Sequence, residues 1–384
     1  MLIKVFTKTM FKVQSRGFCQ IMTVLLKTLR LMFSIHDSAK LKEFLAETWE
    51  KPFRYGQIEN AIYKNFVTDF DEIQTIPQAL RDKLKENCHY TTLTVDHEAT
   101  SKNDQTTKLL FKTADDLLIE AVIMRHKTGR NTLCISCQAG CPMACTFCAT
   151  GKLWLQKNLS VGEILDQVMY AAKLLNDEWG RLRNIVFMGM GEPMLNYDAM
   201  KLGIEAMCDQ KKFDLSNRRV TVSTCWIVPG INKFADDFPQ NGLAVSLHAP
   251  NDEIRKSIMP VDHTYPIEKL MSSLDRYTEK NNKRIFYEYI MINGVNDHIK
   301  LAYELGELLK WRLAHVNFIP YNAWEGTGWT YSATPRFIIE KFQKILLEYG
   351  IVSTIRATMW DDIDAACGQW ARKKKDEEAK AEDK

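Results

Sequence analysis

The sequence predicts an α/β protein: a partial barrel of six strand–helix units, preceded by a small helical domain and a short linking β-sheet. After Asn131, short apolar runs alternate with segments whose apolar residues recur at helical spacing. Such alternation is typical of a parallel sheet whose strands are connected by helices and which curls into a full or partial barrel. The chain has 384 residues, 46% of them hydrophobic and 26% charged, which fits one large globular domain with a smaller one.

Residues 1–36 form a basic leader without any acidic side chain. Its most apolar stretch, Ile21–Phe33, contains Lys27 and Arg30 and is too short and too charged to span a bilayer. Two interpretations stay open. The leader is either an organelle transit peptide, which has this kind of composition, or a non-native extension upstream of a start at Met32.

Residues 37–90 are predicted to form a small helical domain. Asp37 or Ser38 can cap a first helix, in which apolar residues recur at helical spacing until Pro52 stops it. A second helix is expected near Gln57–Asn65, and Ile76-Pro77 opens a third.

Residues 91–130 are predicted to form the linking β-sheet, because apolar and polar side chains alternate there. The expected antiparallel strands are Tyr90–Val95, Thr107–Phe111 and Leu117–Ile123.

Residues 131–371 are predicted to form the barrel, and residues 372–384 a charged, solvated and disordered tail. The expected strands are Thr132–Cys137, Asn184–Met188, Val220–Ser223, Leu243–Leu247, Ile285–Met291 and Val316–Pro320, with a seventh extended segment at Ile351–Ile355. The expected helices include Val161–Leu175, Ala199–Met207, Ile267–Glu279 and Leu301–Leu309. Ser160 and Glu163 form a capping box at the start of the first of these helices.

Polar and glycine-rich motifs follow the predicted barrel strands. They are Cys141–Cys148, Gly189–Pro193, Ser223-Thr224, Ser246–His248 and Pro320–Asn322. In α/β barrels the functional residues gather at the carboxyl ends of the strands, so the motifs predict one common site. Each motif also has a structural explanation: Gly189 and Gly191 could serve a tight turn only, and His248 could be a buried core histidine.

Three cysteines, Cys141, Cys145 and Cys148, have C-x3-C-x2-C spacing. Three thiolates can hold three corners of a four-iron cluster and leave one iron free for a small molecule. A structural zinc site is the alternative, with Cys134 or Cys137 as the fourth ligand. Five of the ten cysteines lie between positions 134 and 148, whereas a secreted disulfide scaffold has its cysteines spread evenly along a short chain. The clustering therefore favours a reducing compartment.

The net charge of +3 neither demands nor excludes a nucleic-acid partner. Local basic residues could meet phosphate or could simply form a solvated face. They are Lys152, Lys157, Lys211, Lys212, Arg218 and Arg219.

Together the motifs resemble the RlmN/Cfr family of radical S-adenosylmethionine (SAM) RNA adenine methyltransferases. The resemblance extends from about Ser38 to Gln369. It is carried by Cys134–Cys141, Phe147–Gly151, Gly189–Pro193, Ser246–Asn251 and Asp362–Gln369. Within the family, Glu192-Pro193 and Ile319-Pro320 resemble the branch that methylates adenine C2 rather than C8.

The resemblance implies a four-iron–four-sulfur (4Fe-4S) cluster and SAM as cofactors. Cys141, Cys145 and Cys148 would ligate the cluster, and SAM would chelate its open iron. The residues that would surround SAM are Gly191, Glu192, Ser223, Ser246, Leu247, His248 and Asn322.

Three further residues would carry the methyl transfer. Adenine C2 has no lone pair with which to attack the sulfonium of SAM, whereas a cysteine thiolate can attack it. By resemblance, Cys367 would take the methyl group and carry it to the adenine as a carbon radical. Cys134 would then attack the sulfur of the tethered product and release it, leaving a disulfide with Cys367. Glu120 would remove the C2 proton, although it could also be an edge-strand charge only.

The resemblance also implies partners. The substrates would be 23S rRNA and tRNA, docked by the helical domain, and electrons would come from a donor such as a flavodoxin. We expect a monomer without membrane contact, in the cytoplasm unless the leader is a transit peptide. C8 methylation and a non-catalytic, zinc-stabilised RNA-binding protein remain the alternatives. Two residues depart from the family pattern: Cys137, which we interpret as an idle buried thiol, and Cys225.

Overall fold

The computed structural model describes residues 32–322, 331–356 and 369–374. The leader up to residue 31, Cys367 and the tail from residue 375 lie outside the described residues. The chain divides into two compact units. One consists of the chain up to Ile58 with Val67–Tyr90, and the other of Glu59–Phe66 with the chain from Thr91 onward.

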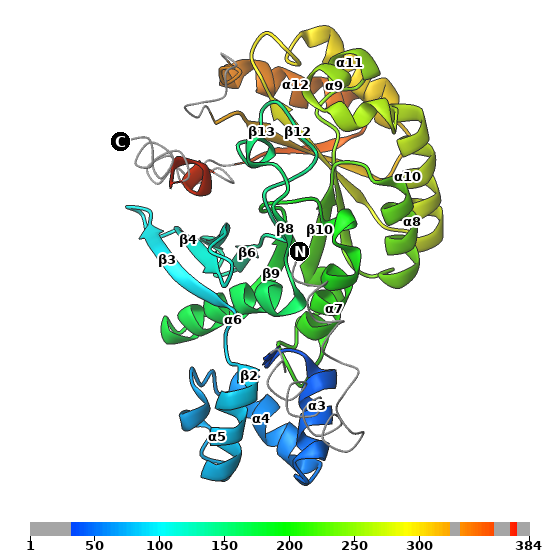
Figure 1. Ribbon diagram of the computed structural model, residues 1–384. Helices are drawn as coiled ribbons and strands as arrows, with labels where there is room; N and C mark the ends of the chain where they lie inside the picture. Colours follow the sequence, from blue (N-terminus) through cyan, green and yellow to red (C-terminus); the bar gives the residue numbers. More distant parts are fainter. Residues whose placement is uncertain (1–31, 323–330, 357–368, 375–384) are drawn as a thin grey trace, which may run out of the picture. The chain divides into compact units, whose positions relative to one another are not determined.

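The first unit is mainly helical (Figure 1). Its first helix, α3, begins after Asp37, whose side chain accepts a hydrogen bond from the N–H of Lys40 at 3.0 Å, as an N-cap does. The elements are β1 (Phe33–Ser34), α3 (Ser38–Glu47), α4 (Phe53–Tyr63), η1 (Phe70–Glu72), α5 (Gln78–Asn87) and β2 (Cys88–His89); the last residues of α4 belong to the second unit.

The second unit is built on one ten-stranded sheet, with the strand order β14-β13-β12-β11-β10-β9-β6-β5-β4-β3 in the described residues. Seven consecutive strands of this sheet are parallel to one another. They are β6 (Asn131–Cys134), β9 (Leu182–Phe187), β10 (Val220–Thr224), β11 (Gly242–Ser246), β12 (Ile285–Met291), β13 (Ala314–Pro320) and β14 (Val352–Ile355). The order is linear, so the predicted partial α/β barrel is confirmed, with β14 as its seventh parallel strand.

The linking strands differ from the prediction in one respect. β3 (Leu93–Thr100), β4 (Thr106–Thr113) and β5 (Leu118–Arg125) are antiparallel, as expected, but they do not form a separate sheet. β5 pairs with β6 through contacts such as Val122 with Cys134, so the hairpins extend the barrel sheet. The sequence could not indicate this because strand pairing between segments depends on tertiary contacts.

Seven helices cover the sheet in the described part of the second unit, in addition to the helical residues 369–374. They are α6 (Val161–Asp177), α7 (Tyr197–Cys208), α8 (Val228–Asp237), α9 (Asp252–Ile258), α10 (Ile267–Asn281), α11 (Ile299–Leu309) and α12 (Arg336–Glu348). The predicted capping box is present at α6, where the N–H of Ser160 donates to Glu163 at 2.8 Å and the N–H of Glu163 donates back to Ser160 at 3.2 Å. α6 packs on α7, α8 on α10, and α11 on α12.

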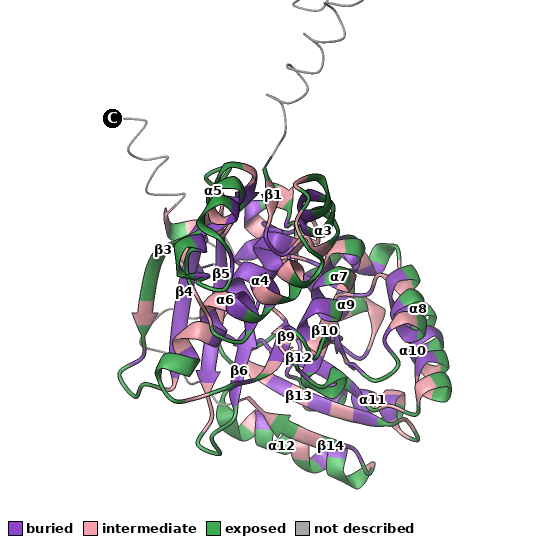
Figure 2. Ribbon diagram, turned by 90° about the horizontal axis from the view of Figure 1, so that it is seen from below, coloured by how far each residue is buried: buried purple, intermediate pink, exposed green. Residues whose placement is uncertain are grey.

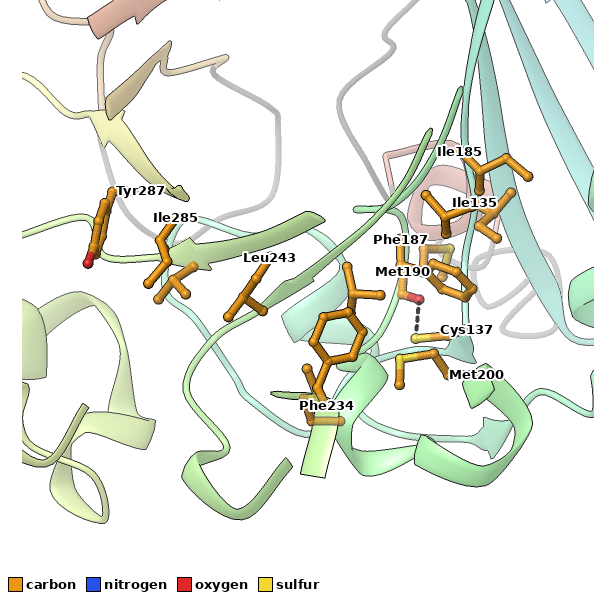
Figure 3. Close-up of a cluster of buried hydrophobic side chains, with 14 of the residues drawn as sticks. Ile135, Cys137, Ile185, Phe187, Met190, Met200, Phe234, Leu243, Ile285 and Tyr287 are labelled. Carbon is orange, nitrogen blue, oxygen red and sulfur yellow. Dashed lines mark hydrogen bonds between the residues drawn. The ribbon is translucent and has the colours of Figure 1, made fainter. Parts of the chain in front are cut away.

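The core lies between the sheet and these helices. Figure 2 shows strands that are largely buried and helices whose outer faces are exposed. Figure 3 shows side chains of this core, among them Ile185 and Phe187 on β9 and Met200 on α7. No described helix is long and apolar enough to cross a membrane.

Short elements shape the loops around the barrel strands. β7 (Gln138–Ala139) pairs with β8 (Lys157–Asn158), and η2 (Thr150–Leu153) lies between them. The others are η3 (Pro193–Leu195), η4 (Asn217–Arg219) and η5 (Pro260–His263).

Candidate functional site

A cavity of about 300 Å³ lies where the parallel strands end, as the motifs predicted. This volume is at the lower end of the range found for small-molecule sites. Its lining includes nine of the residues that sequence reasoning singled out: Glu120, Cys134, Cys148, Gly191, Glu192, Ser223, Ser246, His248 and Asn322.

The cysteine loop is closed by the short β7–β8 ladder, in which Gln138 pairs with Asn158. Ala144, in the middle of the loop, has a φ of +52°. The N–H of Thr146 donates to the carbonyl of Ile258 at 3.0 Å, which ties the loop to the end of α9. Gly151 lies so close that an added Cβ would be 3.1 Å from the carbonyl oxygen of Cys145. The loop is therefore fixed by its neighbours on several sides.

The three cluster cysteines lie together beside the cavity. Cys141 and Cys145 are buried, and Cys148 is half-buried and lines the cavity. Burial raises the pKa of Cys141, and the neighbouring Cys148 raises it further. Burial likewise raises the pKa of Cys148, with Cys145 adding to it. The three thiols therefore lie within electrostatic reach of one another.

The donor set fits an iron–sulfur cluster better than a single zinc ion. Among the described residues, no three His, Cys, Asp or Glu side chains converge tightly enough to hold one metal ion. Two thiolates on a tetrahedral zinc would lie only about 3.8 Å apart. A four-iron cluster takes cysteine thiolates at separate corners, so it accepts a wider triangle of sulfurs.

The glycines of the Gly189–Glu192 loop are required by close packing. Gly191 has a φ of +102°, and an added Cβ would lie 2.5 Å from Cβ of Gln138. An added Cβ on Gly189 would lie 2.6 Å from the carbonyl oxygen of Ile135. The loop lies flat against the chain that follows β6, and the N–H of Glu192 donates to the side chain of Gln138 at 2.8 Å.

The Glu192 carboxylate ties two cavity loops together. One oxygen accepts the N–H of Met194 at 3.0 Å. The other accepts the N–H of Cys225 at 2.7 Å and its thiol at 2.9 Å. Burial raises the pKa of Glu192, while these hydrogen bonds oppose the rise. The neighbouring Cys145 thiol, burial and the charge of Glu192 raise the pKa of Cys225.

His248 lines the cavity as a neutral ring. Its φ of +58° turns the imidazole so that Nδ1 accepts the N–H of Ile290 at 3.0 Å. Burial lowers the pKa of His248 to about 3, and Arg255 contributes. With Nδ1 accepting, the ring proton is on Nε2, which can donate to a ligand. The side chain of Leu247, in contrast, packs in the core, and Leu247 is not among the residues that line the cavity.

Cys134 and Glu120 meet at one wall of the cavity. Burial raises the pKa of Cys134 to about 11, the charge of Arg356 opposes the rise, and Glu120 adds to it. Glu120 is buried and forms an ion pair with Lys108, with Oε2 3.2 Å from Nζ. It is therefore not an exposed edge-strand charge.

Cys137 points away from this wall. It is buried in the core, and its thiol donates to the carbonyl oxygen of Met190 at 3.7 Å (Figure 3). This position agrees with the interpretation of Cys137 as an idle buried thiol. Cys367 lies outside the described residues, so its distance from Cys134 is not given by the structure.

Two charged cavity residues were missed by the sequence reasoning. Glu288 on β12 is buried, and its carboxylate accepts a hydrogen bond from Asn317 at 2.8 Å. Burial raises the pKa of Glu288, and Arg356, which also lines the cavity, opposes the rise. A lone carboxylate in the apolar segment Ile285–Met291 was the available signal, because an unpaired charge is rare in a buried strand.

A buried ion pair supports the loops after β10 and β11. Arg255 and Asp262 are both fully buried, with 2.7 Å between Nη1 and Oδ1. The Arg255 guanidinium also donates to the carbonyl oxygens of Leu247 at 3.1 Å and Ser246 at 3.3 Å. Its carbon lies 3.1 Å from the ring centroid of Trp226.

Comparisons with known proteins agree with this arrangement. The family model for the radical SAM superfamily matches residues 135–305, and that for the N-terminal domain of a ribosomal RNA large-subunit methyltransferase matches residues 35–89. The probable dual-specificity RNA methyltransferase RlmN of Geobacillus kaustophilus is 42% identical over 89% of this chain and 92% of its own. That of Bacillus pumilus is 41% identical over 91% of this chain and 95% of its own.

A solved structure is similar over the same extent. The crystal structure of a radical SAM methyltransferase from Sphaerobacter thermophilus has a TM-score of 0.85 and 39% identity, covering 88% of this chain and 98% of that one. The chain belongs to the RlmN/Cfr family of radical SAM RNA methyltransferases.

Proposed function

We propose that this enzyme methylates C2 of an adenine in 23S rRNA and in tRNA, with S-methylated Cys367 as the intermediate. Family membership makes it a SAM-dependent RNA methyltransferase that uses a 4Fe-4S cluster. The observation that carries the proposal is that Cys148, Cys134 and Glu120 line one cavity. A ligating cysteine, a second thiol and a carboxylate are the three kinds of group that this reaction needs at one place.

Cys141, Cys145 and Cys148 would hold the cluster. When bound, the cluster supplies the electron that cleaves SAM. Around SAM, the neutral His248 ring offers an Nε2–H donor, and Ser223, Ser246 and Asn322 offer polar side chains. Gly191 and Glu192 would contribute mainly by fixing the loop, since Glu192 is already held by Met194 and Cys225. Leu247 could take part only through its backbone.

The chain's own residues would move the methyl group and the protons. Cys367 accepts the methyl group, a radical derived from a second SAM takes one hydrogen atom from it, and the remaining methylene carbon bonds to adenine C2. Glu120 takes the C2 proton as one electron leaves the adduct, which balances the electron spent on cleaving SAM. Cys134 then attacks the sulfur of the adduct, so a Cys134–Cys367 disulfide forms, and the electron pair of the broken sulfur–carbon bond stays on the methylene carbon, which takes a proton and becomes the methyl group.

The finer assignments belong to the same proposal. Residues 37–90 would dock RNA, and residues 91–130 would link this domain to the barrel. Residues 131–371 would form the catalytic barrel, and residues 372–384 would form a solvated tail. The similarity of residues 35–89 to the N-terminal domain of a ribosomal RNA methyltransferase supports the first of these roles. We propose a monomer that works in the cytoplasm with an electron donor such as a flavodoxin.

The test is anaerobic reconstitution, followed by methylation of defined rRNA and tRNA fragments with labelled SAM. Mass mapping of the product should place the methyl group on adenine C2; a methyl group on C8 would assign the protein to the other branch. Bound zinc without iron and sulfide after anaerobic purification would end the enzyme proposal.

Cysteine variants test the roles of the thiols. Cys367→Ala should lose all methyl transfer to RNA, and retained turnover would refute its role. Cys134→Ala should trap a covalent protein–RNA adduct. Cys137→Ala is the matched control, because it lies three residues away but in the core; adduct trapping by this variant alone would reverse the assignment.

A further inference from the structure

The two oxygens of Glu120 hold different parts of the chain. Oε2 pairs with Lys108 of the adjacent strand β4 at 3.2 Å, and both side chains are buried. Glu120 stands opposite Leu110, so Lys108 is its diagonal neighbour on the same face of the sheet. Oε1 accepts the N–H of Ala371 at 2.9 Å. Ala371 belongs to the helical segment 369–374, which follows Cys367 in sequence.

Trp370 completes the contact. Its ring centroid lies 4.5 Å from Nζ of Lys108 and 4.9 Å from the ring of His97 on β3, which it meets edge to face. A desolvated ammonium group over an aromatic face is stabilised by the ring quadrupole. Ala371 is buried as well, so the segment is seated on the face formed by β3, β4 and β5.

We propose that Lys108, Glu120 and Trp370 form an anchor that fixes the segment after Cys367, and that Lys108 is a positioning residue for methyl transfer. This inference rests on the proposed role of Cys367. Only Gly368 separates Cys367 from Gln369 in the sequence. The anchor therefore fixes the chain immediately after the proposed methyl acceptor, at the wall that carries Glu120.

Hydrogen–deuterium exchange of the full-length protein tests the anchor without any reaction. The peptide that covers residues 369–374 should exchange at least tenfold faster in Lys108→Met than in the unmodified protein. Lys112→Met is the matched control, because Lys112 lies on the same strand and pairs with Asp116 at the surface. Unchanged exchange in Lys108→Met, or equal acceleration in both variants, would overturn the proposal.

Two further variants distinguish loss of the anchor from misfolding caused by removal of a buried lysine. Trp370→Leu should also accelerate exchange, since it breaks the contact from the side of the segment. Lys108→Arg, which keeps the charge, should restore much of the protection. Unchanged exchange in Trp370→Leu would show that the Trp370 ring does not contribute to the anchor.

Mass spectrometry of Cys367 after incubation with SAM separates this inference from the proposed function. Methylation of Cys367 should be at least tenfold slower in Lys108→Met than in the unmodified protein. If the unmodified protein never methylates Cys367, the proposed function fails while the exchange result still decides on the anchor.

A second inference comes from the tryptophans. Five of the six tryptophans in the described residues have a positive φ, where a bulky side chain is an outlier. They are Trp49 (φ +61°), Trp154 (+51°), Trp179 (+59°), Trp226 (+104°) and Trp311 (+69°). Only Trp370, in the helical segment, lacks this conformation among the described tryptophans.

Trp49 and Trp179 occupy the usual glycine position of a helix end. After α3, the N–H of Trp49 donates to the carbonyl of Ala46 at 3.1 Å and that of Glu50 to Leu45 at 2.9 Å. After α6, the corresponding bonds of Trp179 and Gly180 are 3.0 and 2.7 Å long. These are the paired bonds of a Schellman motif, in which the left-handed residue is most often glycine. The same two bonds end α12, and there the left-handed residue is Gly350.

The other positions also disfavour a side chain. Trp154 combines its positive φ with a ψ of 166°, close to a region that is essentially restricted to glycine. Trp226 is buried, its indole N–H has no hydrogen-bond partner among the described residues, and the guanidinium carbon of Arg255 lies 3.1 Å from its ring centroid. Trp49, Trp179 and Trp311 are 94%, 98% and 96% exposed, so packing of these side chains does not explain the left-handed backbone.

The geometry points to glycine at these five positions in the natural protein. The codon UGA is read as tryptophan in some genetic codes and as glycine in others. A gene that uses it for glycine, translated with the tryptophan code, would place tryptophan at glycine positions throughout the chain. Trp370, in a right-handed helical conformation, would then be a true tryptophan.

Peptide mapping by mass spectrometry of the protein isolated from its natural source decides this directly. Glycine at positions 49, 154, 179, 226 and 311 is expected, and tryptophan there would overturn the inference. In recombinant protein, Trp49→Gly and Trp179→Gly should each raise the midpoint of thermal unfolding, although loss of a large side chain usually lowers it. Gly350→Trp is the matched control and should lower the midpoint; a fall in all three variants would refute the backbone argument.

Discussion

The raised pKa of Cys134 makes a quantitative prediction about the last step of the reaction. Only the thiolate attacks the adduct sulfur, and burial raises the pKa of this thiol to about 11. At about pH 8 roughly one molecule in a thousand therefore carries the thiolate, and the fraction grows about tenfold for each pH unit. Release of the methylated RNA should accelerate by nearly two orders of magnitude between about pH 7 and pH 9.

The assay is single-turnover decay of the covalent protein–RNA adduct under anaerobic conditions. Arg356→Met should slow the decay at about pH 8, because the charge of Arg356 lowers the pKa of Cys134 and its loss raises that pKa. Arg356→Lys keeps the charge and serves as the control. A decay rate that does not change between these pH values would show that thiolate formation does not limit release, which would refute the reasoning.

Three further predictions concern the supports of the cavity. Asp262→Ala leaves Arg255 buried without its partner and should cost about 3–5 kcal/mol of unfolding free energy in urea titration; a loss under about 1 kcal/mol would contradict this. Gly191→Ala places a Cβ 2.5 Å from Cβ of Gln138 in a left-handed backbone conformation. We expect it to lower the unfolding free energy by at least about 1–2 kcal/mol and to weaken SAM binding measured by calorimetry. Gly129→Ala is the control for the backbone cost alone, because Gly129 also has a positive φ but has open space around it. His248 has its pKa lowered to about 3 in the folded state, so the unfolded chain gains its proton first as the pH falls, and stability is lost below the unfolded value near 6.5. Between about pH 6.5 and pH 5 this amounts to about 2 kcal/mol, which His248→Gln should abolish; an equal pH dependence in that variant would contradict it.

Periodicity and spacing were sufficient to predict the barrel. Segments such as Ile285–Met291 are apolar enough to form buried strands wherever they pair, and the predicted and observed bounds of that strand coincide. Local chemistry was equally informative at Ser160 and Glu163, since a capping box depends only on residues three apart. α8 was not predicted, because its first turn contains Pro229-Gly230, a pair that also signals a turn.

What the sequence could not provide depends on the third dimension. Cys134 ends β6 and Cys137 follows three residues later, and only the fold shows that Cys134 lines the cavity while Cys137 lies in the core. Leu247 stands between two cavity residues, yet its side chain packs in the core. The pairing of Lys108 with Glu120 needed the register of β4 with β5, which no local pattern specifies.

The continuity of the antiparallel hairpins with the barrel sheet has a practical consequence for protein engineering. Glu120, Val122 and Met124 of β5 form part of the cavity wall. A fragment that starts at Asn131, where the repeating strand–helix pattern begins, would therefore lack one wall of the cavity. A transplantable catalytic module has to start near Thr91, and chimeras between family members should be joined before that residue rather than at the edge of the repeat.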